Sequence, residues 1–116
     1  MKFLRQLLSQ CSVSGDESGV SAFIFKTIQE RKKNWKVIPE IFFGENFHDC
    51  ILLKFGNPTT AVFAHIDTVG FMTRYSNQLV PVGGPEVIAG TKLVGKDRFG
   101  DIECSLIGDE DAVFHD

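Results

Sequence analysis

The segment TAVFAHIDTVG, residues 60–70, decides the fold that the sequence predicts. Residues 61–64 are uniformly apolar and lack the alternation of polar and apolar side chains that marks a strand with one solvated face. Such a run is typical of a strand that is buried on both faces, in a sheet covered by helices. We therefore expect an α/β fold in which residues 60–64 form a strand near the centre of a helix-covered mixed sheet.

Two helices are expected before this strand. The first dozen residues place apolar side chains at helical spacing, and residues 20–28 do the same. The segment between them, SVSGDE at residues 12–17, is rich in residues that cap helices and form turns. The pattern predicts a short first helix that ends near Ser12 and a second helix that runs from about Asp16 to Lys33.

Short strands are expected on both sides of residues 60–64. Upstream, residues 35–43 and 50–55 are rich in the β-branched and aromatic residues that favour strands. Downstream, strand-like segments alternate with glycine-containing turns and span residues 71–75, 79–82, 91–94 and 102–106. The second group indicates small antiparallel β structure. We therefore divide the chain into an α/β domain at residues 1–76 and a β-rich domain that starts at residues 77–116.

Composition and charge exclude several functional classes. The net charge is −3, and the basic residues are scattered apart from RKK at residues 31–33, so we expect no nucleic-acid partner. No segment approaches the roughly 20 consecutive apolar residues that a membrane-spanning helix needs. The three cysteines, Cys11, Cys50 and Cys104, are odd in number and widely spaced, which indicates neither a disulfide framework nor a thiolate zinc site. We expect a cytoplasmic protein with reduced thiols and no membrane partner.

His65 and Asp67 stand where the apolar run ends and a glycine-containing turn begins. Side chains two residues apart on a strand point to the same side of the sheet, so these two can converge. In open α/β sheets, ligands bind beyond the carboxyl ends of strands. A neutral imidazole is a good zinc ligand, and a nearby carboxylate can hold its tautomer. Taken without further context, the pair also fits a purely structural role, in which both residues merely cap the strand end.

The nine residues AHIDTVGFM, residues 64–72, resemble the metal-binding strand of the co-catalytic aminopeptidase and carboxypeptidase clan. Upstream, SVSGDE at residues 12–17 is similar to the turn that these enzymes place between their first two helices. Downstream, LVPVGG at residues 79–84 and GTKLV at residues 90–94 resemble the glutamyl and deblocking branch, the tetrahedral-shell, endoglucanase-like aminopeptidases. The resemblance implies a catalytic domain interrupted by a small, barrel-like β insert.

The resemblance also implies roles for two residues. His65 matches a ligand of one metal ion, and Asp67 matches the catalytic-site carboxylate that orients this ligand. Relatives hold two divalent ions, zinc or cobalt, and hydrolyse N-terminal residues from peptides with a metal-activated water. Their remaining ligands and their general base follow the β insert, and here they would come after residue 116. We therefore expect a peptide substrate, a homo-oligomeric full-length protein, and no activity in the 116-residue chain alone.

Two other segments have only a superficial likeness to the missing ligands. KDRFG at residues 96–100 resembles the Asp-x-Arg-x-Gly that carries a bridging carboxylate, but Lys96 would stand at the ligand position and repel a metal. The acidic tail with Asp109, Glu110 and Asp111, followed by His115 and Asp116, fits a solvated turn better than a set of ligands.

Two alternative functions stay open. Thr68 stands where the aminopeptidase branch often has an acidic residue, and the carboxypeptidase branch commonly has threonine there. A carboxypeptidase or deacylase of the same clan is therefore an alternative. A non-enzymatic α/β scaffold or binding module that keeps the peptidase pattern is the other.

Overall fold

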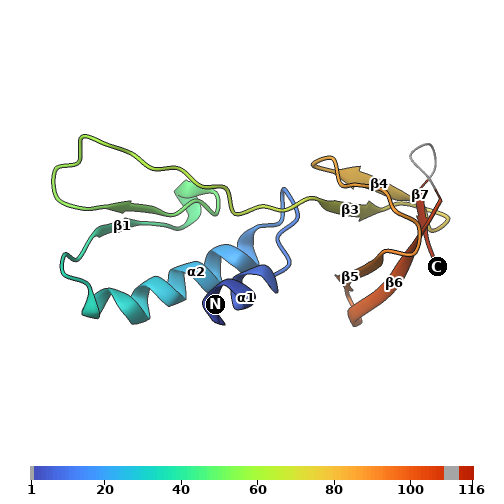
Figure 1. Cartoon of the computed structure of the whole chain (residues 1–116), viewed down its shortest axis with the longest axis horizontal. Coiled ribbons are helices and arrows are strands. Elements are labelled where there is room, and N and C mark those ends of the chain that lie inside the picture. The colour runs from blue at the N-terminus through green and yellow to red at the C-terminus, as the bar shows by residue number, and fades with distance from the viewer. Residues whose placement is uncertain (1, 109–112) are drawn as a thin grey trace. The chain divides into compact units, whose positions relative to one another are not determined.

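The computed structural model describes residues 2–108 and 113–116 (Figure 1). The chain forms two compact units, of which the first ends at Asp67 and the second begins at Thr68. This division comes earlier than the expected boundary at residue 76. The reason is that strand β3 (Gly70–Thr73) pairs with strand β4 (Leu79–Val82) and so belongs to the second unit.

The two expected helices are present in the first unit, each shorter than the pattern predicted. Their bounds are Lys2–Leu8 for α1, Ser18–Arg31 for α2 and Lys32–Asn34 for the 3₁₀ turn η1 that follows. Val20 and Ile28, two positions of the predicted apolar face of α2, are buried. Phe3 of α1 stacks on Phe23 of α2 with ring centroids 5.9 Å apart. The apolar face of α2 therefore packs inward, as its helical spacing predicted.

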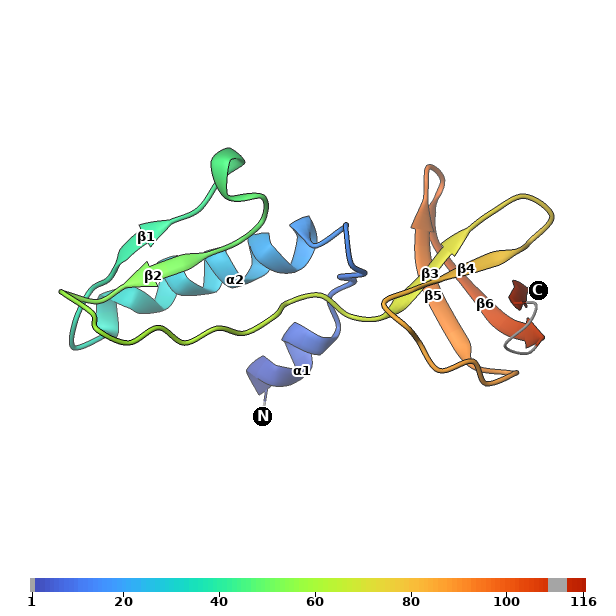
Figure 2. The same cartoon turned by 90° about the horizontal axis from the view of Figure 1, so that it is seen from above.

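A short β-hairpin completes the regular secondary structure of the first unit. It comprises β1 (Glu40–Phe42), the 3₁₀ turn η2 (Glu45–Phe47) and β2 (Leu52–Lys54). The strands are antiparallel, with Ile41 opposite Leu53. Phe43, just after β1, stacks on Phe25 of α2 at 4.4 Å between centroids, which holds the hairpin along the helix (Figure 2). Ser21 of α2 is fully buried.

The mixed α/β character of the chain is confirmed, but the strands form several small sheets. There are two-stranded pairs β1–β2 and β3–β4, and a three-stranded sheet β5–β6–β7 whose bounds follow below, all antiparallel. A single helix-covered mixed sheet is not present in residues 2–108 and 113–116. Across the same residues, no helix has the length and apolar character needed to cross a membrane.

The expected central strand at residues 60–64 is wrong for this structure. Residues 61–67 are extended but belong to no strand, and Val62 and Phe63 are 93% and 92% exposed. A strand exists only where a neighbour supplies the other half of its hydrogen-bond ladder. Residues 60–64 have the composition of a buried strand but no strand partner within the described residues.

The second unit is built from hairpins whose strands are close in sequence. Strands β5 (Lys92–Asp97) and β6 (Gly100–Gly108) pair along their length, and β7 (Val113–His115) adds to β6. An isolated bridge joins Gln78 to Phe114. These strands confirm the antiparallel β structure expected for this part of the chain, while closure into a barrel stays a prediction.

The turn chemistry and the core of the second unit agree with its sequence. Ser76 and Asn77, in the turn between β3 and β4, have φ angles of 57° and 59°. Two successive residues with positive φ make the type of turn that fits the twist of a hairpin. Leu79, Leu106 and Val113 form the buried cluster. The hairpins therefore enclose a small apolar core of their own.

Candidate metal-binding site

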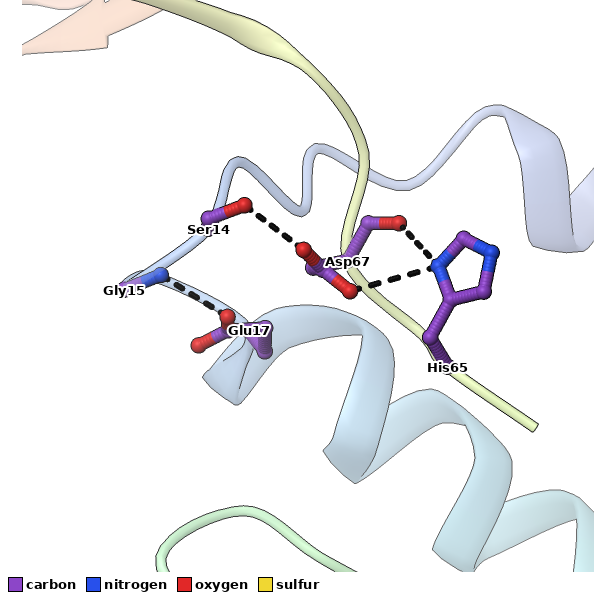
Figure 3. A network of polar contacts seen from close by, with 5 residues as sticks. All are labelled: Ser14, Gly15, Glu17, His65 and Asp67. Atoms are coloured by element: carbon purple, nitrogen blue, oxygen red, sulfur yellow. Dashed lines mark hydrogen bonds and ion pairs between the residues drawn. The ribbon is translucent and has the colours of Figure 1, made fainter. Parts of the chain in front are cut away.

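The structure brings His65 and Asp67 into direct contact (Figure 3). His65 Nδ1 lies 3.0 Å from the backbone carbonyl oxygen of Asp67 and 3.3 Å from its Oδ1 atom. The sequence predicted their convergence from the alternation of side chains along a strand. The contact is found although residues 65–67 belong to no strand.

The tautomer of His65 follows from the identity of these partners. A carbonyl oxygen and an ionised carboxylate can only accept hydrogen bonds, so Nδ1 must carry the proton and donate. In the neutral ring the lone pair is then on Nε2. Figure 3 shows Nε2 directed away from Asp67, and the side chain of His65 is 86% exposed. The nitrogen that could bind a metal is therefore the accessible one.

Ser14 is the third member of the site, and sequence reasoning missed its role. Its Oγ atom donates a hydrogen bond of 2.6 Å to Oδ2 of Asp67, from a position 53 residues earlier in the chain. Ser14 lies in the turn between α1 and α2, within the SVSGDE segment that resembled the family turn. That resemblance indicated the turn, but it gave no sign that the serine contacts Asp67.

The turn that carries Ser14 is held by its own hydrogen bonds. The Asp16 amide donates to the Val13 carbonyl at 2.8 Å, and the Gly15 amide donates to Glu17 Oε1 at 2.8 Å. Gly15 has a φ angle of 93°, a conformation that side chains rarely adopt. The sequence Ser-Gly therefore allows a sharp turn that presents the serine hydroxyl to Asp67.

The electrostatics of the site favour the ionised form of Asp67. The hydrogen bond from Ser14 is the main cause that lowers the pKa of this carboxyl below its ordinary value, and the His65 ring acts in the same direction. Partial desolvation opposes them but is outweighed. Asp67 is therefore a carboxylate at neutral pH, as an orienting partner of a histidine ligand must be.

The described residues do not form a complete metal site. In residues 2–108 and 113–116, no group of three or more His, Cys, Asp or Glu side chains is arranged to hold a metal ion. Zinc in proteins takes three or four protein ligands. One imidazole with an orienting carboxylate fits such a centre in chemistry and direction, and it needs further ligands to complete it.

The other segments with a likeness to ligands have structural roles where they are described. Asp97 Oδ1 accepts hydrogen bonds from the amides of Phe99 and Gly100, at 2.7 and 3.1 Å, and so shapes the β5–β6 turn. In the acidic tail, Asp116 Oδ1 accepts a 2.5 Å hydrogen bond from the Ser105 amide.

Residues Asp109, Glu110 and Asp111 of that tail lie outside the described residues. The expectation for them stays a prediction.

No protein-family model matches this chain, and no curated protein is significantly similar to it.

Proposed function

We propose that this chain supplies one metal ligand, His65, and its orienting carboxylate, Asp67, to a metal-dependent aminopeptidase. The observation that carries the proposal is the donation of Nδ1–H of His65 to two oxygens of Asp67, which leaves Nε2 exposed. Carboxylate–histidine–metal arrangements of this kind fix both the tautomer and the ring orientation of a ligand. The resemblance of residues 64–72 to the metal-binding strand of the clan points to the same two side chains.

The proposed reaction is the hydrolysis of the first peptide bond of a peptide. Two divalent ions, zinc or cobalt, would lower the pKa of a bound water and stabilise the oxyanion that forms at the scissile carbonyl. The part of this chain is to hold His65 in one orientation. The proposal requires a second histidine, a bridging carboxylate and a general base in addition to His65 and Asp67.

The experiment uses the complete gene product that contains this chain, beside the 116-residue chain itself. Metal content is measured by mass spectrometry, and release of N-terminal residues is measured on a panel of peptides. We expect two ions per complete chain, amino-acid release, and neither property in the 116-residue chain. His65→Asn should lower metal affinity and activity by more than the roughly 10–100-fold typical for loss of an outer-shell partner, and metal content should fall with the affinity.

The matched control is His48→Asn. His48 is exposed and has a φ angle of 45°, which asparagine tolerates well, so this change removes an imidazole away from the site. It should leave metal content and activity unchanged. A complete protein that folds normally but binds no divalent metal would refute the proposal and favour the non-enzymatic module.

The substrate panel separates the second enzyme class. An aminopeptidase needs a free α-amine, so N-acetylated peptides should resist it and C-amidated peptides should not. The opposite result would indicate the carboxypeptidase that the threonine at position 68 allows. Turnover by the repurified 116-residue chain that is lost in His65→Asn would show that the site is complete without further ligands.

A further inference from the structure

We infer that Ser14 is a positioning residue, which holds the Asp67 carboxylate so that Asp67 fixes the Nδ1–H tautomer of His65. The inference rests on the proposed function for its purpose, but the geometry that supports it is independent of any metal. It adds to the site a residue from the turn between α1 and α2.

The two carboxylate oxygens of Asp67 have different hydrogen-bond partners. Oδ2 of Asp67 accepts from Ser14, and Oδ1 faces His65 Nδ1. Rotation of the carboxylate would break or weaken one of these contacts, so the two together define its plane. The 2.6 Å contact from Ser14 is the shorter of the two, in the range of strong hydrogen bonds to an ionised acceptor.

The segment that carries His65 and Asp67 lies outside the named strands. Residues 61–67 have no strand partner in the described part of the chain, and the His65 side chain is largely exposed. No named sheet therefore positions residues 61–67 in the described part of the chain. A long-range hydrogen bond to a well-formed turn is a physical means of holding Asp67, and Ser14 provides one (Figure 3).

The turn that carries Ser14 is preorganised by its own hydrogen bonds. A positioning group is effective when it is itself held in place by surrounding contacts. The Asp16–Val13 and Gly15–Glu17 hydrogen bonds fix the backbone on both sides of Ser14. The hydroxyl therefore reaches Asp67 from a turn that has little freedom to move away.

The test reads the tautomer of His65 directly in the 116-residue chain, which contains all three residues. Long-range ¹H–¹⁵N NMR spectra of the imidazole distinguish Nδ1–H from Nε2–H. They are recorded at a pH at which an ordinary imidazole is neutral. We expect the Nδ1–H form to dominate in the wild type. In Ser14→Ala we expect the Nε2–H form to rise several-fold, and Ser14→Thr, which keeps the hydroxyl, should restore the wild-type ratio.

The control is Ser18→Ala, since Ser18 is exposed and its hydroxyl contacts Asp16 at 3.5 Å, outside the site. It should leave the ratio unchanged. The inference is overturned if Ser14→Ala keeps the wild-type ratio, or if threonine behaves as alanine does. Should Ser14→Ala not fold, the wild type decides alone, because a dominant Nε2–H form is incompatible with the inferred arrangement.

A second arm separates this inference from the proposed function. In the complete gene product, Ser14→Ala should weaken zinc or cobalt binding by about 10–100-fold, as loss of an outer-shell partner typically does. A tautomer change without any metal binding by the wild-type complete protein would support the positioning role of Ser14 and refute the metallopeptidase. Metal binding by the complete protein, with an unchanged tautomer in Ser14→Ala, would support the metallopeptidase and refute the positioning role of Ser14.

Discussion

The strands of the second unit and the segment at residues 61–67 of the first unit use extended backbone in opposite ways. In the second unit every named strand pairs with another, and the buried cluster of Leu79, Leu106 and Val113 lies among these strands. In the first unit, the extended segment at residues 61–67 carries the candidate site with no strand partner in the described residues. The same kind of sequence, rich in apolar and β-branched residues, has therefore produced a core in one place and an exposed segment in the other.

The difference is one of sequence separation between partners. A hairpin strand finds its partner a few residues away, and a short loop costs little entropy to close. A strand at the centre of a mixed sheet needs distant partners, which residues 2–108 and 113–116 do not supply to residues 61–67. The site-bearing segment is instead tied by a polar contact, from Ser14 to Asp67.

The largest effect that would test this comparison is expected from Leu106→Ala. Leu106 is 1% exposed at the centre of the second unit's cluster. Truncation of a buried leucine typically costs about 2–5 kcal/mol of the free energy of unfolding. A small core provides only a small total stability, so this loss is a large part of it. Amide hydrogen exchange of β5 and β6 measures the loss.

Ile107→Ala is the matched control, because Ile107 is the next residue of β6 and is 49% exposed. Adjacent strand residues face opposite sides, so the same truncation should cost much less there. Equal losses from both variants would show that the cluster of Leu79, Leu106 and Val113 is not the core that stabilises the hairpins.

The local parts of the fold could be predicted from the sequence. The strand at residues 79–82 has the predicted bounds, and strands β3, β5 and β6 overlap their predicted positions, whereas β7 was not predicted. Both helices were predicted from apolar spacing, but α1 already ends at Leu8 and α2 ends at Arg31. These features depend on side chains within a few positions of one another, which is the information that a sequence pattern contains.

The parts that could not be predicted depend on distant residues. The apolar run at residues 61–64 indicates a buried strand only if another segment covers it, and the pattern contains no information on whether one does. The Ser14–Asp67 contact joins residues 53 positions apart, and nothing in the local sequence indicates the distance between them. The convergence of His65 and Asp67 could be predicted, since it needs only residues that are two apart.

A smaller effect is expected at the C-terminal end of the second unit. The Ser105 amide donates to Asp116 Oδ1, and this hydrogen bond, with a contribution from the charge of Lys92, lowers the pKa of the Asp116 carboxyl. Because the pKa is depressed in the folded state, the stabilisation is fully present above the ordinary aspartate pKa of about 3.9 and is lost as the pH falls through the folded-state value. The chemical shift of the Ser105 amide, followed from neutral pH to about pH 2, should change with a midpoint below that ordinary value.

Asp116→Asn should remove this pH dependence, since an amide does not titrate. Asp101→Asn is the control: Asp101 is exposed and pairs with Lys96 at 3.7 Å, on the other half of β6. It should leave the Ser105 titration unchanged. A midpoint at or above that of an ordinary aspartate would show that the carboxylate does not accept the Ser105 amide in solution.

The smallest effect is expected from Phe63→Ser in the exposed segment. Phe63 is 92% exposed, and surface substitutions usually change the free energy of unfolding by no more than about 0.5 kcal/mol. Trp35, the only tryptophan, lies in the first unit, so its fluorescence during urea unfolding measures the stability of that unit.

Phe25→Ser is the comparison variant, because Phe25 stacks on Phe43 at 4.4 Å between ring centroids. This change should cost more, since it removes both packing area and an aromatic pair. If Phe63→Ser costs as much as Phe25→Ser, then residues 61–64 are packed in solution. The candidate site would in that case lie at the end of the buried strand that the apolar run predicts, and Asp67 would be held by a sheet as well as by Ser14.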